Sequence, residues 1–477
     1  MRVYLLDLSL RRSEATEAIS LRVRLLRSLR SLAMTSSGIA LISSLTIFMA
    51  GCGRGISDAA NGKHPVEIRV AFWGGPDEVN ITTGIINAWQ KSHPDIVVKL
   101  DHTPYRGYID KLLTRIAGRS APDIICTEVD LFVTFQAKGV LLDLTPFVSA
   151  DPEFSTKQFY PEIVNRFTVG GKLYAIPRDT APFACVYYNK KLFDEAGVPY
   201  PKDDWNLDDL LDKARKLTKT DKDGRVTQYG FYAWAWPNFV YAFGGSMVDN
   251  VRDPSKCTLD SGESIAGLKF YSDLINKYKV HPTSTAMTNL AMGVQGMFMT
   301  GRLAMFSSGI WETPGLRKMV DLDWDVAMFP KGPPGPTVGS EGPLSRRPGG
   351  IRAFGTGGSG YCILKETKNP NAAFEVIKAL AGRSGQTALA DTGLAQPAIK
   401  DIAQSGRWVF DNKPPKNKSM LDEAMKYVIY EPFHPAWREA KELYINPELD
   451  MVFSGKRSVE DAVKNFTGKV DNLLKKQ

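Results

Sequence analysis

Cysteine is scarce in this sequence, and the patterns in which cysteines bind metals or exchange disulfides are missing. The chain has 477 residues and five cysteines, none in a C-x-x-C pair, which excludes the common zinc and thioredoxin-type motifs. Cys126, Cys185 and Cys362 lie in apolar, strand-like runs, where a thiol packs as a small hydrophobic group. Cys52 and Cys257 complete the set. A disulfide between two of the four cysteines after Cys52 stays open as an alternative in an oxidising compartment.

Signatures of common enzymes are missing as well. The sequence has no G-x-S-x-G, no P-loop and no H-E-x-x-H motif, and its five histidines are scattered along the chain. We therefore expect no catalytic residue, no metal ion and no cofactor. Asp221 and Asp223 begin like a calcium loop, but no acidic ligand follows at EF-hand spacing. A turn over Asp221–Gly224 is the preferred interpretation.

Excess charge of one sign is small. The formal net charge is +8, but the first 51 residues hold seven arginines and three acidic residues, so the remainder carries only +4. A surplus this small and this evenly scattered does not predict a nucleic-acid partner. With 43% hydrophobic and 23% charged residues, the composition is that of a soluble globular protein. The length favours two lobes with ample core.

The sequence near the N-terminus has the features of an export signal. Arginines at positions 22, 24, 27 and 30 precede an apolar segment, 39–50, which is shorter than the roughly 20 residues of a membrane span. Met49-Ala50-Gly51-Cys52 resembles the bacterial lipobox, in which the cysteine is diacylated and becomes the mature N-terminus. Ordinary signal cleavage beside an unrelated cysteine is the alternative. We predict a lipoprotein signal over 1–51 and a lipid-anchored tether over 52–65.

Strands and helices alternate after this tether. The pattern predicts strands at 67–73, 96–100 and 123–126, with helices at 79–89, 108–117 and 131–137, and such alternation indicates a parallel doubly wound sheet. Ligands of such sheets bind beyond the carboxyl ends of the strands. This rule selects Trp73, Glu128 and Asp130 as candidate ligand-binding residues. Asp130 is also a plausible N-cap of the following helix, and the two roles are compatible.

The stretch GKLYAIPRDTAPFACVYYNKKLFDEAG, 171–197, contains a short strand, a break, a buried strand at 183–188 and a helix capped by Asn189. It resembles the interlobe crossover of family 1 extracellular solute-binding proteins, the sugar-binding components of ATP-binding-cassette importers. The residues that carry the resemblance are Gly171, Lys172, Tyr174, Pro177, Tyr188, Asn189, Lys190, Phe193, Ala196, Gly197, Val198 and Pro201 to Trp205.

The resemblance extends from about residue 66 to about residue 470. The segments 116–146 and 361–381 are similar to that family, and so is the run with Phe298, Gly301, Ala304, Met305, Gly309 and Trp311. In maltose-type members a carboxylate at the Asp130 position bonds sugar hydroxyls, and a tryptophan at the Trp311 position stacks on sugar. The aromatic stretch 228–240 adds Trp234 and Trp236 as cleft candidates, with core packing as the alternative for both.

The family implies an α/β fold of the type II periplasmic-binding-protein kind, with two lobes joined by hinge crossovers. Each lobe is expected to have a mainly parallel sheet flanked by helices. We assign the N-terminal lobe to 66–180 plus about 330–382, and the C-terminal lobe to 181–329 plus about 383–477. The chain is expected to return to the first lobe at Val326–Phe329. Two late segments, 421–430 and 459–474, are predicted to be helical.

The resemblance also implies partners: a carbohydrate, the transmembrane permease subunits of the importer, and a membrane reached through the lipid anchor. We expect an extracytoplasmic monomer that closes over its ligand about crossovers near Pro177 and Phe329. Sugars offer hydroxyls to carboxylates and apolar faces to aromatic rings, which suits tryptophans combined with Glu128 and Asp130.

Two other functions stay open. A binding protein for a polyol or a glycerol phosphate would take its anion-binding fork from Arg178, Arg347 or Arg352. A glycoside hydrolase would use Glu128 and Asp130 as its carboxylate pair, but two residues at one strand end are badly placed to flank a scissile bond.

Overall fold

The computed structural model describes residues 65–290, 292–333, 350–407, 413–417 and 420–475. All of these lie in one unit, Lys63–Gln477. The predictions for the signal, the tether, Cys52 and Arg347 fall outside the described residues. Within the described residues, no helix combines the length and the apolar character that crossing a membrane requires.

The first sheet contains the three strands predicted from the alternating pattern. Strand β1 (Val66–Trp73) lies between β2 (Ile96–Thr103) and β3 (Ile124–Glu128) and is parallel to both. On the other side of β3 lie β15 (Ser359–Ile363) and then β6 (Ile176–Pro177), each antiparallel to its neighbour. Ile68 and Val70 of β1 and Ile124 and Ile125 of β3 are fully buried, which stabilises the strands against helices on both faces.

Helices cover this sheet and extend to its carboxyl edge. They are α2 (Pro76–Gln90), α3 (Tyr105–Ala117), α4 (Val129–Ala137), α14 (Pro370–Ala381) and α15 (Arg383–Thr392). Helix α2 begins at a proline and carries Asp77 and Glu78 in its first turn, where acidic groups favour a helix N-terminus. Helix α15 packs against α14 and α2, so both sides of the boundary assigned near residue 382 contact the same part of the fold.

The second sheet is built around β8 (Cys185–Asn189), the strand that follows the crossover. Strands β12 (Met305–Ser308) and β13 (Trp324–Met328) flank β8, and both are antiparallel to it; β11 (Tyr232–Ala233) is parallel to β12. The expectation of a mainly parallel second sheet does not hold for these pairs. Likewise Val326–Met328 does not return the chain to the first lobe. These three residues belong to β13 and pair with Tyr187, Val186 and Cys185 of β8.

The chain instead reaches the first sheet again through β14 (Phe354–Thr356) and β15. Strand β14 pairs in parallel with β17 (Val428–Tyr430), a segment predicted to be helical. Only α17 (Met420–Ala424) of that prediction is a helix. The β-branched pair Val428-Ile429 suits a strand once β14 offers a partner, a contact from more than 70 positions away.

The helix cap and the turn that local sequence signals predicted are both present. Asn189 caps α7 (Lys190–Glu195) by accepting a hydrogen bond from the Leu192 amide at 3.2 Å. Asn206 begins α8 (Leu207–Leu217) in a reciprocal capping box. The predicted turn is present, since Asp221 accepts hydrogen bonds from two backbone amides within the next four residues.

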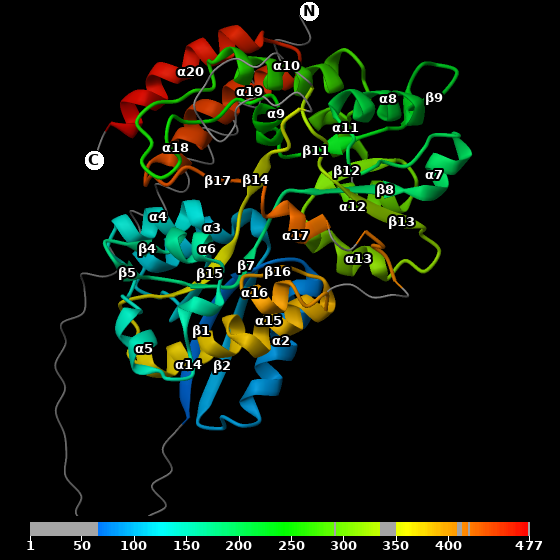
Figure 1. The fold of residues 1–477 in the computed structure, drawn as a ribbon. Helices are drawn as coiled ribbons and strands as arrows, with labels where there is room; N and C mark the ends of the chain where they lie inside the picture. The colour runs from blue at the N-terminus through cyan, green and yellow to red at the C-terminus, as the bar shows by residue number, and fades with distance from the viewer. Residues whose placement is uncertain (1–64, 291, 334–349, 408–412, 418–419, 476–477) are drawn as a thin grey trace, which may run out of the picture. The chain divides into compact units, whose positions relative to one another are not determined.

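A second apolar cluster lies among helices from the middle of the chain and from its C-terminal part, which are green and orange to red in Figure 1. Its elements are α9 (Pro237–Ala242), α10 (Gly262–Asn276), α18 (Trp437–Ala440), the π-helical segment Lys441–Ile445, α19 (Asn446–Phe453) and α20 (Val459–Leu474). The prediction for α20 is confirmed at both ends. Eight of its side chains are buried on one face, as expected of an amphipathic helix.

The four cysteines within the described residues are free and buried, so the disulfide alternative is not realised among them. Cys126, Cys185 and Cys362 lie in strands, as predicted. The remaining elements are short: α5 (Thr145–Ala150), α6 (Pro161–Arg166), β4 (Thr168–Val169), β5 (Lys172–Leu173), β7 (Asp179–Thr180), β9 (Lys219–Thr220), β10 (Val226–Gln228), α11 (Ser284–Leu290), α12 (Val294–Met299), α13 (Thr313–Arg317), β16 (Gln396–Pro397), α16 (Lys400–Ala403) and the 3-10 turns Thr156–Gln158 and Ile310–Glu312.

Candidate functional site

A cavity of about 730 Å³ opens where the strand ends of both sheets meet the crossover segments. The loops after β1 and β3 contribute residues from the first sheet, and the segment after β12 contributes residues from the second. Five of the seven predicted ligand-binding residues line this cavity: Trp73, Glu128, Asp130, Trp234 and Trp311. The edge of the first sheet that the strand-end rule selected is thus an edge that lines this cavity.

Trp236 and Arg352 do not line the cavity. The backbone turns tightly at Trp234, whose carbonyl accepts the Trp236 amide at 3.0 Å, and α9 begins directly afterwards. This turn separates two tryptophans that a strand would have placed on one face, and Trp236 packs against the apolar core. The Arg352 guanidinium donates to the Asp203 carbonyl and lies 3.2 Å from the Met328 sulfur.

Three aromatic rings form one wall of the cavity. The Phe183 ring contacts Trp234 edge-on at 4.8 Å between centroids and Trp311 edge-on at 6.1 Å. The two indoles are 6.4 Å apart and tilted by 45°. Trp234 is 43% exposed although it is a large apolar residue. It lines the cavity and is not buried in the core. Such a wall offers flat apolar surface to a ligand.

Gly309 gives the Trp311 ring its position. A Cβ atom at residue 309 would lie 1.8 Å from the indole carbon Cζ3, although the backbone φ of −102° is open to any residue. We predict that Gly309→Ala displaces the indole and weakens binding of whatever ligand the aromatic wall contacts, by about tenfold or more. Titration calorimetry measures this. Gly84→Ala in α2 is the control, since nothing lies within 4 Å there, and an equal loss in both variants would contradict the assignment.

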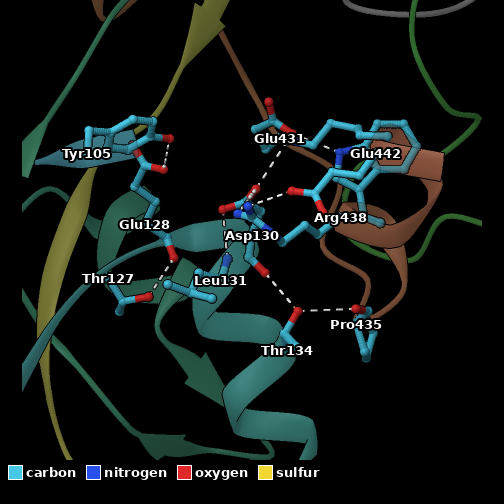
Figure 2. A network of polar contacts seen from close by, with 12 residues as sticks. Tyr105, Thr127, Glu128, Asp130, Leu131, Thr134, Glu431, Pro435, Arg438 and Glu442 are labelled. Atoms are coloured by element: carbon cyan, nitrogen blue, oxygen red, sulfur yellow. Dashed lines mark hydrogen bonds and ion pairs between the residues drawn. The ribbon is translucent and has the colours of Figure 1, made fainter. Parts of the chain in front are cut away.

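Asp130 also lines the cavity and is held in a network of charges (Figure 2). One carboxylate oxygen accepts the Leu131 amide at 2.7 Å, and the other lies 3.1 Å from the Lys441 ammonium. The N-cap of α4 is Glu128, so Asp130 stabilises the first turn from inside it. Burial alone would raise the pKa of Asp130, but Lys441 and Arg438 hold that pKa below its ordinary value.

Lys441 joins Asp130 to a second carboxylate. Its ammonium also lies 3.1 Å from Glu431, whose same oxygen accepts a hydrogen bond from the Trp437 indole at 2.8 Å. Lys441 belongs to the π-helical segment, and Glu431 follows β17. π-Helical turns interrupt regular helices and often occur at functional sites. Neither residue was selected from the sequence, because no local pattern connects position 441 with position 130.

Glu128 differs from its neighbour Asp130. Its carboxylate accepts a hydrogen bond from the Tyr105 hydroxyl at 2.8 Å and forms no ion pair with any described residue. Burial, followed by the nearby charge of Asp130, raises the pKa of Glu128 to about 7. Two carboxylates at one strand end thus have opposite pKa shifts, one raised and one lowered.

The raised pKa of Glu128 has a consequence for stability. The folded state holds the Glu128 proton more tightly than the unfolded state does. The stability that the protonated Glu128 contributes is therefore fully present below about pH 4.5 and is lost as pH rises to about 7. We expect Glu128→Gln to remove this component, so that the variant gains stability relative to the wild type between pH 5 and pH 8. Urea unfolding at both pH values measures the difference. An unchanged pH dependence would contradict the shift.

Arg178 lines the cavity and belongs to a buried cluster of charges. Its guanidinium pairs with Glu78 from α2 and with Asp179 at 2.7 Å. Asp179 in turn accepts the Ser359 amide at 2.9 Å and the Ser359 hydroxyl at 2.7 Å. Burial raises the pKa of Glu78, an effect that Arg178 partly opposes. The arginine considered for an anionic ligand is thus already engaged by two carboxylates.

Within the described residues, no group of histidine, cysteine or carboxylate side chains is arranged to hold a metal ion. The cavity combines an aromatic wall with carboxylates. Tyr105, Phe183 and Glu312 also line it and were not selected from the sequence. Tyr105 follows the carboxyl end of β2, where the strand-end rule could have found it, whereas Phe183 lies in the crossover before β8, where that rule does not apply.

Comparison with known proteins gives concordant matches. Residues 75–387 match the family model of the bacterial extracellular solute-binding proteins. The fold is similar to that of an ABC substrate-binding protein of Listeria monocytogenes solved with cycloalternan, with a TM-score of 0.75 and 24% identity over 86% of this chain and 98% of that chain. An arabinooligosaccharide-binding protein of Halalkalibacterium halodurans is 25% identical over 315 residues, 64% of this chain and 65% of that protein. An uncharacterized lipoprotein of Streptomyces antibioticus is 25% identical over 312 residues, 62% of this chain and 65% of that protein.

Proposed function

Since this chain belongs to the bacterial extracellular solute-binding proteins, we propose that it binds a mono- or oligosaccharide outside the cytoplasm and delivers it to an ATP-binding-cassette permease. The observation that carries the proposal is the aromatic wall of Trp234, Phe183 and Trp311 in a cavity that also contains Glu128 and Asp130. Rings bind the apolar faces of a sugar, and carboxylates accept its hydroxyl protons.

Import requires a conformational change that the permease can read. The two sheets of this chain are linked by the segment 177–185, which we assign as a hinge crossover between an N-terminal and a C-terminal lobe, and the described residues 329–333 and 350–358 lie between the last strand of the second sheet and β15 of the first. Ligand contacts from both lobes would favour the closed state, because each bound hydroxyl or ring face then bridges the two. The relatives named above include proteins described as binding cycloalternan and arabinooligosaccharides, which supports a carbohydrate ligand.

We also propose that Cys52 carries a lipid anchor. The support is the lipobox-like Met49-Ala50-Gly51-Cys52 and the description of one relative as a lipoprotein. The full chain should then fractionate with membranes, and Cys52→Ser should release it into the soluble fraction. Recovery of the unmodified Cys52 chain in the soluble fraction would contradict the anchor.

A phosphorylated ligand is disfavoured by the lining of the cavity. Seven lining residues are acidic and two, Arg178 and Lys441, are basic. Both cations already contact two carboxylates each, so neither is free to form a fork with a phosphate. A neutral polyol remains compatible with the same rings and carboxylates.

The proposal is tested by thermal unfolding of the chain from Gly53 onward with mono- and oligosaccharides, polyols and sugar phosphates. A ligand at a hundred times its dissociation constant adds about 2.7 kcal/mol to stability, which is visible as a raised melting temperature. We expect a shift with at least one sugar and unchanged ligand afterwards. A shift with phosphates alone, or conversion of the ligand into product, would overturn the proposal.

A further inference from the structure

We propose that the corner of the cavity formed by Trp73, Tyr105 and Glu128 binds a protonated amine, and that the ligand is a saccharide bearing an amino group. This inference rests on the proposed sugar-binding function and specifies the chemical class of the sugar. It is carried by the charges that line the cavity, by how those charges are paired, and by the geometry of this one corner.

The seven carboxylates that line the cavity outnumber the four cations that pair with them among the described residues, which are Arg178, Lys318, Arg438 and Lys441. Four of its acidic residues share the two lining cations: Glu78 and Asp179 contact Arg178, and Asp130 and Glu431 contact Lys441. A fifth, Asp77, pairs with Lys318, a mostly exposed lysine. Fields from one sign of charge are focused in a cleft with apolar walls. Such a lining favours a cationic ligand over an anionic one.

Two lining carboxylates, Glu128 and Glu312, have no cation within ion-pair distance among the described residues. Glu312 is supported by its own surroundings, because its carboxylate accepts hydrogen bonds from the Ser308 hydroxyl at 3.0 Å and from the Trp311 side chain. Glu128 accepts one side-chain hydrogen bond, from Tyr105. A carboxylate has about four acceptor positions, so Glu128 retains capacity for a ligand donor.

The rings next to Glu128 complete an ammonium-binding geometry. The Tyr105 side chain is 55% exposed, and its hydroxyl is the group that holds Glu128 (Figure 2). The Tyr105 ring meets Trp73 edge-on, with centroids 6.0 Å apart and planes at 74°. Trp73 and Tyr105 both line the cavity. Aromatic faces attract an ammonium group through the ring quadrupole, and the carboxylate supplies the opposite charge.

The ionisation of Glu128 gives the site a pH dependence. The titratable groups that face this carboxylate are the neutral Tyr105 hydroxyl from α3 and three charged side chains. These are Asp130 from α4, Lys441 from the π-helical segment and Glu431 after β17. With a pKa of about 7, Glu128 is partly protonated when the cavity is empty at neutral pH. An ammonium ligand binds the ionised form, so its affinity should rise between pH 6 and pH 8. A neutral sugar has no comparable dependence on this proton.

Titration calorimetry at low ionic strength tests the inference with maltose, cellobiose and mannobiose, and with the 2-amino-2-deoxy and 6-amino-6-deoxy derivatives of each. Primary alkyl amines such as the 6-amino group titrate near the value of lysine, about 10, and stay charged over pH 6–8. We expect an amino derivative to bind about tenfold or more tightly than its parent sugar, since charge-assisted hydrogen bonds exceed neutral ones by that order. For the 6-amino derivatives, which stay charged, the preference should grow from pH 6 to pH 8.

Glu128→Gln should abolish this preference and its pH dependence, so that in the variant an amino derivative binds no more tightly than its parent sugar. Glu366→Gln, which removes an exposed carboxylate outside the cavity lining, should keep both. Equal affinity for neutral and amino sugars, or a preference that survives Glu128→Gln, would overturn the inference and leave the sugar-binding proposal standing. Absence of binding for all nine probes would also overturn it. Failure of the wider thermal panel as well would overturn the proposed function.

Discussion

Replacement of Trp311 by alanine is expected to reduce sugar affinity by about 2 kcal/mol or more, roughly thirtyfold at room temperature. The Trp311 indole contacts both other rings of the aromatic wall, Phe183 and Trp234. It also packs against the apolar cluster of Leu389, Leu394 and Ala395. An aromatic ring of this size removes about 150–250 Å² from water when it is covered. Titration calorimetry with the sugar found in the thermal panel measures the loss.

Trp89→Ala is the matched control for this experiment. Trp89 is half-buried at the end of α2, stacks on His93 at 4.1 Å and does not line the cavity. Its removal should lower the melting temperature and leave the sugar dissociation constant unchanged. If Trp311→Ala binds the sugar as tightly as the wild type, the aromatic wall is not the sugar-binding surface.

The largest expected effect on stability is that of Arg178→Met, a loss of about 3–5 kcal/mol in the free energy of unfolding. The side chain of Arg178 is 7% exposed, and its two carboxylate partners are 14% and 5% exposed. Removing the guanidinium leaves Glu78 and Asp179 buried without a counter-ion. Although burial disfavours a charge at Arg178, the carboxylates raise the pKa of its guanidinium above the ordinary value. Urea unfolding at pH 7 measures the loss.

Arg383→Met provides the comparison, because Arg383 pairs with Asp401 at 2.5 Å with both side chains more than half exposed. Exposed pairs contribute about 0–1 kcal/mol, so this variant should be nearly as stable as the wild type. Adding Glu78→Gln to Arg178→Met should recover part of the loss by removing one unpaired charge. Equal, small losses in Arg178→Met and Arg383→Met would show that the buried cluster is not needed for stability.

The predictable parts of this fold are those with strong local signals. Helix α20 begins and ends where the sequence pattern placed it, and the cap at Asn189 forms as expected. The parallel order of β1, β2 and β3 follows from alternating strands and helices. The helix and the cap depend on residues near one another in the sequence, and the parallel pairing follows from the order of the elements along the chain.

The remaining features depend on contacts between distant segments. Strand β17 exists because β14 pairs with it, and the same residues without that partner would fit a helix. The antiparallel pairs of β8 arise from segments more than 110 positions later in the chain. The Lys441–Asp130 contact spans 311 positions and has no local pattern. Trp236 was expected near the cavity because it belongs to the aromatic stretch 228–240, but it lies next to the start of α9 and packs against the core.

The most direct test of the central claim is titration calorimetry of the wild-type chain from Gly53 onward with the panel of neutral sugars, amino sugars and sugar phosphates, followed by recovery of the ligand. The account predicts saturable binding of a sugar at one site per chain, with the ligand recovered unchanged. Binding restricted to sugar phosphates, or recovery of a cleaved product, would contradict it.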